Sequence, residues 1–438
     1  MSEIDSATFS SVETEPTPAE KKRQTATSEY PAHGDKSIWG IYIFLCLVSI
    51  IELYSASSRE ISINGVFDPL VRHVMFLIMG TLIVVGFERL HYKSFFGLSY
   101  FIGGAAFLMM LYSLKFGDNI NGAVRSFSIG PLSVQPSELI KFAIVLVVGR
   151  IMVFTQQRGD KNKEDKGILI ASLIVAIVAA FLYPQGLTNT ALVVGVALVM
   201  MLVGGVPVGK WLAVVAVFGV LAYGGHKAIK YYHQHKAEAI EATGSVDRTG
   251  VRDSRMASYD PFRQKYNDPI TATNRQEMYS YMAQANGGKF GVFPGNSRET
   301  ARLPLAFSDY IFAIIVEEWG CFGGIVLMST YFFLMIRALI IAKRCHRVYP
   351  LLLVTGMAVM IALQALFHMG IVSGAFPVSG QPLPLISKGG TSILVSCAAF
   401  GVMLSVSRTA VQNGSKKEDR EELKNLPQEL HPDNRTHS

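Results

Sequence analysis

The stretch from Leu303 to Gly320 reads LPLAFSDYIFAIIVEEWG and sets carboxylates into an apolar background. Asp309 stands at the start of the apolar run, and Glu317 and Glu318 follow about two helical turns later. The flanks, IFAII and CFGGIVLMSTYFFLMI, leave no face for water to wet. An ionisable group in or at the edge of a membrane span costs about 2.5–3.5 kcal/mol, so it indicates a functional site. The alternative is that Asp309 is a helix N-cap, because Ser308 and Asp309 precede the apolar run.

Composition supports a membrane protein. Of 438 residues, 50% are hydrophobic and 17% are charged, which is more apolar sequence than a soluble domain can bury. The four cysteines lie in or beside apolar runs without metal-type spacing, so we interpret them as small core residues. We use the net charge of +7 as a topology signal instead of evidence for nucleic acid.

Apolar runs long enough to cross a ~30 Å hydrocarbon core recur along the chain. They predict an all-α polytopic membrane protein of about ten transmembrane helices, with a membrane domain over residues 37–408. The polar segments at 1–36 and 409–438 are predicted to be tails, the first of them disordered. The predicted spans are 38–55, 70–88, 99–117, 137–155, 168–184, 188–205, 208–226, 309–341, 349–370 and 391–408.

Basic residues in the short loops place both termini in the cytoplasm. The run RGDKNKEDK at 158–166 and the cluster around Lys343 and Arg344 are on the predicted inner side. Of the short outer segments between spans, 185–187 has no cation and 371–390 has only Lys388. Long loops do not count in this rule, so the basic residues of the outer segment 227–308 do not change the orientation.

The outer segment 227–308 is too long to be a structureless connector without a function. Its first part, Lys227 to Ala242, has a helical composition that continues the seventh span outwards. Its last part, from Asn286 to Arg298, reads NGGKFGVFPGNSR, and such glycines suit a backbone that approaches a ligand closely. A flexible connector is the alternative.

Charged residues mark two further outer segments. Glu138 and Lys141 follow a helix start at Pro136 and share a face of the fourth span, so they can pair, either for substrate binding or as a structural ion pair. Arg125, in a Gly-containing turn, is suited to clamp phosphate oxygens. Lys388 lies in FPVSGQPLPLISKGGTS and is expected to face a cavity, or alternatively to extend to the headgroups. Glu52 in the first span needs a partner that the sequence does not identify.

Four stretches then occur together: NGAVRSF–QPSELIK, ANGGKFGVFPGNSR, LPLAFSDYIFAIIVEEWG and PVSGQPLPLISKGGTS. In this order, over residues 38–408, they resemble the SEDS family of shape, elongation, division and sporulation proteins. The long N-terminal tail and the wording of the last motif favour the division members over the elongation members. The chain departs from the family pattern at Ser126-Phe127, Pro294, Val316 and Lys388, and none of these removes a titratable group that the chemistry needs.

The resemblance implies a peptidoglycan glycosyltransferase that polymerises lipid II at the outer face of the bacterial inner membrane, for septal wall synthesis. It implies a class B penicillin-binding protein and other divisome membrane proteins as partners. Asp309 is the expected catalytic residue, a general base for the acceptor hydroxyl. The expected substrate-binding residues are Arg125, Glu138, Lys141, Ser297, Arg298 and Lys388. No organic cofactor is expected, and a divalent cation, Mg²⁺ or Mn²⁺, would arrive with the substrate pyrophosphate.

Two other classes of function remain open at this point. Ten spans with intramembrane charges and broken Gly/Pro segments also suit a transporter or lipid flippase. Against that, the polar motifs gather on the outer side instead of the midplane, and the sequence has no convincing inverted repeat. The third class is a non-catalytic scaffold for the division machinery.

Overall fold

The computed structural model describes the chain between residues 33 and 425 with several gaps. The described ranges are 33–56, 67–116, 118–120, 123–129, 132–155, 161–183, 185–240, 268–271, 274–303, 306–345 and 347–425. The predicted N-terminal tail up to residue 32 and the middle of the long outer segment, 241–267, lie outside these ranges.

Long helices follow the apolar runs in order, because a backbone in lipid must satisfy its hydrogen bonds within the segment. Helix α9 continues well beyond the seventh predicted span, which confirms that the helix extends into the segment after it. Helix α14 likewise runs past residue 408 into the segment predicted as a tail. The long helices are α2 (Lys36–Ala56), α4 (Phe67–Arg89), α5 (Tyr92–Phe116), α6 (Pro136–Thr155), α7 (Lys161–Leu182), α8 (Leu187–Val203), α9 (Val208–Ile240), α12 (Ile311–Lys343), α13 (Val348–Val372) and α14 (Gly390–Asn425).

Eight helices of the described chain are long and apolar enough to cross a membrane: α2, α4, α5, α7, α9, α12, α13 and α14. Helix α8 is apolar but shorter, with 17 residues. Helix α6 carries Glu138, Lys141 and Arg150 within its 20 residues. The predicted polytopic helical fold is therefore confirmed.

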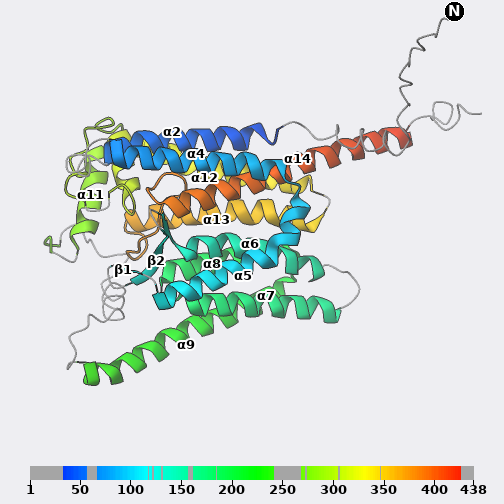
Figure 1. Ribbon diagram of the computed structural model, residues 1–438, viewed down its shortest axis with the longest axis horizontal. Helices are drawn as coiled ribbons and strands as arrows, with labels where there is room; N and C mark the ends of the chain where they lie inside the picture. Colours follow the sequence, from blue (N-terminus) through cyan, green and yellow to red (C-terminus); the bar gives the residue numbers. More distant parts are fainter. Residues whose placement is uncertain are drawn as a thin grey trace, which may run out of the picture.

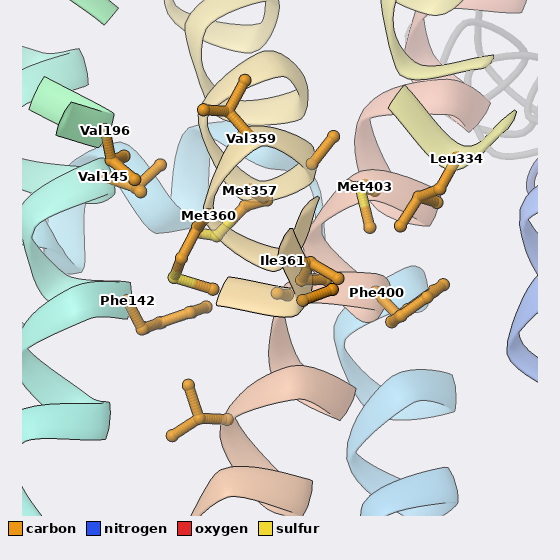
Figure 2. Close-up of a cluster of buried hydrophobic side chains, with 14 of the residues drawn as sticks. Phe142, Val145, Val196, Leu334, Met357, Val359, Met360, Ile361, Phe400 and Met403 are labelled. Carbon is orange, nitrogen blue, oxygen red and sulfur yellow. The ribbon is translucent and has the colours of Figure 1, made fainter. Parts of the chain in front are cut away.

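Helix α13 lies at the centre of the bundle and α9 at its edge. Of the most apolar 18 residues in each helix, 78% are buried in α13 and 83% in the neighbouring α14, whereas none is buried in α9. Figure 1 shows the long helices side by side, with α9 running obliquely along the outside. Figure 2 shows side chains of α13 between those of α6 and α8 on one side and those of α12 and α14 on the other. The labelled residues are Phe142, Val145, Val196, Leu334, Met357, Val359, Met360, Ile361, Phe400 and Met403.

One end of the bundle carries structure that hydropathy did not predict (Figure 1). Helix α11 (Arg275–Gly287) lies there, as does a three-stranded antiparallel sheet of β1 (Asp118–Ile120), β2 (Ala123–Ile129) and β3 (Leu132–Val134). These elements come from the segments predicted to face outwards, so we call this the outer end. The opposite end carries the extension of α14.

Candidate functional site

Asp309 lies in a turn directly before α12, and contacts with a distant segment fix this turn. The backbone N–H of Lys388 donates to the carbonyl of Phe307 at 2.9 Å. The hydroxyl of Ser387 donates to the carbonyl of Ser308 at 2.7 Å. These two bonds bring the segments around Asp309 and Lys388, 79 residues apart in the chain, to one place at the outer end.

The predicted N-cap role of Asp309 is wrong. Helix α12 begins at Ile311, and the N-cap position belongs to Tyr310, whose side chain makes no capping hydrogen bond. The carboxylate of Asp309 instead accepts a hydrogen bond from the Ser308 hydroxyl at 3.2 Å. The helix therefore starts one residue later than an N-cap at Asp309 would give.

Lys388 is half-buried beside an aromatic ring and a buried histidine. Its ammonium lies 4.6 Å from the centroid of the Phe307 ring, a favourable cation–π distance. His73 of α4 is buried and helps to support the same segment. The Nε2 atom of His73 is 2.7 Å from the Ser49 hydroxyl, which in turn donates to the carbonyl of Ile386. Helices α2 and α4 thereby support the segment that carries Lys388.

Glu138 and Lys141 form the predicted ion pair at the start of α6. The Lys141 ammonium is 2.6 Å from Glu138 Oε1, and only 1% and 3% of the two side chains are exposed. The ammonium also donates to Gln364 Oε1 of α13 at 2.8 Å, and the Gln364 amide donates to the carbonyl of Pro382. The pair therefore connects α6, α13 and the segment that leads to Lys388.

A second buried polar group was missed in the sequence. His368 of α13 contacts the carbonyl of Gln381 through Nδ1 at 2.6 Å, and the Gln381 amide donates to Asn189 of α8 at 2.9 Å. Thr188 donates to Ser379 at 2.7 Å. The available signal was the spacing of Gln364 and His368, four residues apart on one face of an otherwise apolar helix.

Arg125 lies on β2, but its side chain lies outside the described residues. The sheet itself is placed by its third strand. The carbonyl of Ser133 on β3 accepts from the Thr391 hydroxyl at 2.8 Å, and the same hydroxyl accepts from the N–H of Gln135 at 3.3 Å. Thr391 follows Lys388 closely in the chain, so the sheet lies beside the Lys388 segment.

Two glycines of the Gly-rich segment, Gly287 and Gly291, lie against the backbone of α12, whereas an added Cβ on Gly288 or Gly295 would meet nothing within 4 Å. A Cβ on Gly287 would lie 2.0 Å from the carbonyl oxygen of Val316, and one on Gly291 would lie 2.1 Å from that of Glu318. Neither position can hold a side chain without moving α12. Arg298, at the end of the segment, is exposed.

The two glutamates of α12 accept hydrogen bonds from this segment. Glu317 is fully buried and accepts a hydrogen bond from the Ser297 hydroxyl at 2.5 Å. Glu318 accepts from the Ser55 hydroxyl and from the N–H of Gly295. The unidentified partner of Glu52 is the next residue of α12, Trp319, whose indole N–H donates to Glu52 Oε1 at 2.5 Å.

Glu299 is a buried acid just outside the spans, beside this cluster. Burial raises its pKa, the guanidinium of Arg302 opposes that rise, and the nearby Glu317 adds to it. Within the described residues, no three His, Cys, Asp or Glu side chains converge in a way that could hold a metal ion.

Known proteins resemble this chain in sequence over most of its length. The profile of the cell cycle protein family that groups FtsW, RodA and SpoVE matches residues 35–412. A probable peptidoglycan glycosyltransferase FtsW of Enterococcus hirae is 26% identical, with 89% of this chain and 96% of that protein covered. The Bacillus subtilis protein of the same name is 27% identical, with 87% and 93% covered. Stage V sporulation protein E of Bacillus subtilis is 27% identical, with 84% and 95% covered.

Solved structures agree with the sequence comparison at the level of the fold. A chain from a peptidoglycan synthase complex that coordinates polymerisation and crosslinking superposes with a TM-score of 0.65 at 24% identity, covering 86% of this chain and 99% of that chain. RodA of Thermus thermophilus superposes with a TM-score of 0.60 at 23% identity, covering 86% and 97%. Since the family profile spans nearly all of the helical bundle, this chain belongs to the FtsW/RodA/SpoVE cell cycle protein family, the SEDS family that its motifs resemble.

Proposed function

We propose that this chain is a peptidoglycan glycosyltransferase that polymerises lipid II, with Asp309 as general base. The carrying observation is that two hydrogen bonds, one from the backbone N–H of Lys388 and one from the Ser387 hydroxyl, join the Lys388 segment to the Asp309 turn. They place a carboxylate and a cation together at the outer end of a membrane bundle. Relatives that align with 87–89% of this chain are named as probable peptidoglycan glycosyltransferases, and these names support this chemistry.

The two charges serve different parts of the reaction. The 4-hydroxyl of one lipid-linked disaccharide attacks the anomeric carbon of another, and a polyprenyl pyrophosphate leaves. Asp309 takes the proton of the attacking hydroxyl, which is a poor nucleophile without a base. Lys388 stabilises the negative charge that develops on the leaving pyrophosphate, and Arg125 and Arg298 at the same end bind the phosphate oxygens of the substrate. A divalent cation bound to that pyrophosphate would share this work.

The direct test is polymerisation of lipid II by the purified protein. Replacement of Asp309 by Asn keeps the size of the side chain and removes the base, so we expect glycan synthesis to fall by about 10²–10⁴-fold. Asp165→Asn is the matched control, an exposed acid of α7 that pairs with Lys210, and it should keep wild-type activity. Undiminished synthesis by the Asp309 variant would refute the general-base role. Lipid translocation without any glycan product in the wild type would favour a flippase.

We further propose the division role and the partner. The division role is supported by the FtsW names of several relatives, and the partner by the likeness to a chain of a peptidoglycan synthase complex. The partner is a class B penicillin-binding protein, and the active face is the outer face of the inner membrane. Depletion of the protein should block septation and give filaments, whereas rounded cells would indicate an elongation role. Co-purification with the penicillin-binding protein tests the partner.

A further inference from the structure

We propose that Glu317 is a positioning residue for substrate binding, which holds the segment from Ser297 to Glu299 so that Arg298 is presented at the outer end. The inference rests on the proposed function, because it assigns how one substrate-binding cation is kept in place. Glu317 itself lies in the interior, with none of its surface exposed, so it acts through the segment and not on the substrate.

The first observation is a break in α12. Gly320 has φ 71° and ψ −175°, so the helix is interrupted after Trp319 and resumes at Cys321. Such a break leaves helix-end carbonyls and N–H groups without partners within the helix. The Gly-rich segment supplies the missing hydrogen-bond partners. The carbonyls of Glu317 and Glu318 accept from the N–H groups of Val292 at 3.0 Å and Phe293 at 2.8 Å.

The same segment also accepts hydrogen bonds from the first N–H groups after the break. The N–H of Cys321 donates to the carbonyl of Gly288 at 2.9 Å, and that of Phe322 donates to the carbonyl of Lys289 at 3.2 Å. The segment thus bonds both halves of α12. A Cβ on Gly320 would lie 2.3 Å from the carbonyl oxygen of Lys289, which explains the glycine at the break.

The second observation is the set of donors around the Glu317 carboxylate. It accepts from the N–H of Arg298 at 3.1 Å, from the N–H of Glu299 at 3.4 Å and from the Ser297 hydroxyl at 2.5 Å. The Asn286 amide at the end of α11 donates to it at 3.3 Å. One buried carboxylate therefore fixes three consecutive residues and ties them to α11.

These contacts separate the roles of Ser297 and Arg298. The Ser297 hydroxyl is engaged with Glu317 and also accepts from the N–H of Thr300 at 3.2 Å and from its hydroxyl at 2.8 Å. The Ser297 hydroxyl therefore holds the segment in place and is not available to a substrate. The backbone of Arg298 is held while its side chain is exposed, so the guanidinium is the group left to meet a phosphate.

Replacement of Glu317 by Gln tests this assignment with little change in size. An amide keeps one acceptor oxygen but turns an NH₂ group towards backbone donors, so the bonds to Arg298 and Glu299 cannot both persist. We expect KM for lipid II to rise by roughly 10-fold, the effect of about one lost charge-assisted hydrogen bond, while kcat stays within about 2-fold. Asp309→Asn should show the opposite split, with a loss in kcat.

A double-mutant cycle identifies the route through Arg298. In an Arg298→Ala background the Glu317→Gln change should have little further effect on KM, because the group that it positions is gone. Glu88→Gln is the matched control at the opposite end. Glu88 is also buried and accepts from the N–H of Gly34 at 2.5 Å and from the Trp39 indole at 3.2 Å. This control should keep the wild-type KM.

Hydrogen–deuterium exchange of peptides over residues 295–303 gives a second measurement that needs no activity. Faster exchange there in the Glu317 variant, and not in the Glu88 variant, is expected. Unchanged exchange, or effects on KM that add in the double variant, would overturn the proposal. If the wild type makes no glycan, the proposed function fails, and the exchange experiment still decides whether Glu317 holds this segment.

Discussion

Lys141 shows what a membrane interior requires of a single charged residue. Its ammonium is buried and placed between Glu138 Oε1 and Gln364 Oε1, at 2.6 and 2.8 Å. The interaction of the pair does not by itself make the bundle more stable than an apolar pair would, because burying both charges is costly. Removing one partner is different, since it leaves a charge in the interior without compensation.

We therefore predict that Lys141→Met is more harmful alone than in combination. The single variant leaves the Glu138 carboxylate buried without its cation, and the loss of stability should be about 3–5 kcal/mol. Adding Glu138→Gln should recover most of that loss. The apparent Tm of the detergent-solubilised protein measures both effects. Losses that simply add in the double variant would contradict the buried-pair interpretation.

At the scale of the element, α12 consists of two helical parts that meet at Gly320 and make different contacts. The first, from Ile311 to Trp319, is packed in the interior and bonded to the Gly-rich segment, and the second spans the bundle. Helix α12 has 33 residues, more than one span needs, and the break at Gly320 divides this length into two parts. The break makes the outer half an attachment site for the loop that continues to Asp309.

Gly320→Ala is predicted to destabilise this arrangement. Its positive φ is unfavourable for a residue with a Cβ, by about 1–3 kcal/mol, and that Cβ would collide with the carbonyl oxygen of Lys289. We expect a lower Tm and reduced glycan synthesis. Gly104→Ala in α5, where an added Cβ meets nothing within 4 Å, is the control and should be neutral or slightly stabilising. Equal behaviour of the two variants would argue against a required break.

At the scale of the whole molecule, the end opposite the site is held by its own contacts. The guanidinium of Arg337, in the second half of α12, bonds both carboxylate oxygens of Asp35 at distances from 2.6 to 3.0 Å. The N–H of Asp35 donates to Ser407 of α14 at 2.9 Å. The residues just before α2 are thus bonded to α12 and α14. These bonds hold the N-terminal end of α2 against the bundle at the end opposite the candidate site.

This contact predicts an acid-sensitive contribution to stability. Burial alone would raise the pKa of Asp35, but the hydrogen bonds and charge of Arg337 and the N–H groups of Ser37 and Ile38 outweigh it, so the pKa lies below its usual 3.8. A lowered pKa stabilises the fold above the unfolded-state value, and this stability is lost as the pH falls through the lower folded-state value. Asp35→Asn should therefore lower Tm at pH ~7, and this effect should shrink as the pH falls below 3.8 and through the lowered folded-state pKa.

The control for this prediction is an exposed pair. Asp165 is 2.7 Å from Lys210, and its side chain is 59% exposed. Because exposed pairs contribute little, Asp165→Asn should leave Tm unchanged across the same pH range. A difference between wild type and Asp35→Asn that persists in acid would show that lost packing, and not ionisation, causes the effect.

Hydropathy and short-range spacing determined much of this protein from the sequence alone. The spans could be predicted because lipid exposure makes each helix apolar over its own length. The ion pair of Glu138 and Lys141 could be predicted because residues three apart share a helical face. The small sheet and α11 could not, since short polar elements carry no comparable hydropathy signal.

Only the tertiary structure decided how the outer end is assembled. The place of Asp309 beside Lys388, the partner of Glu52 and the donors around Glu317 all involve residues distant in the chain. Helix α12 begins past Asp309, and the Gly-rich segment bonds to α12. A sequence read locally specifies which residues must find a partner in the membrane. Which partner each one finds is decided by the packing of helices from opposite parts of the chain.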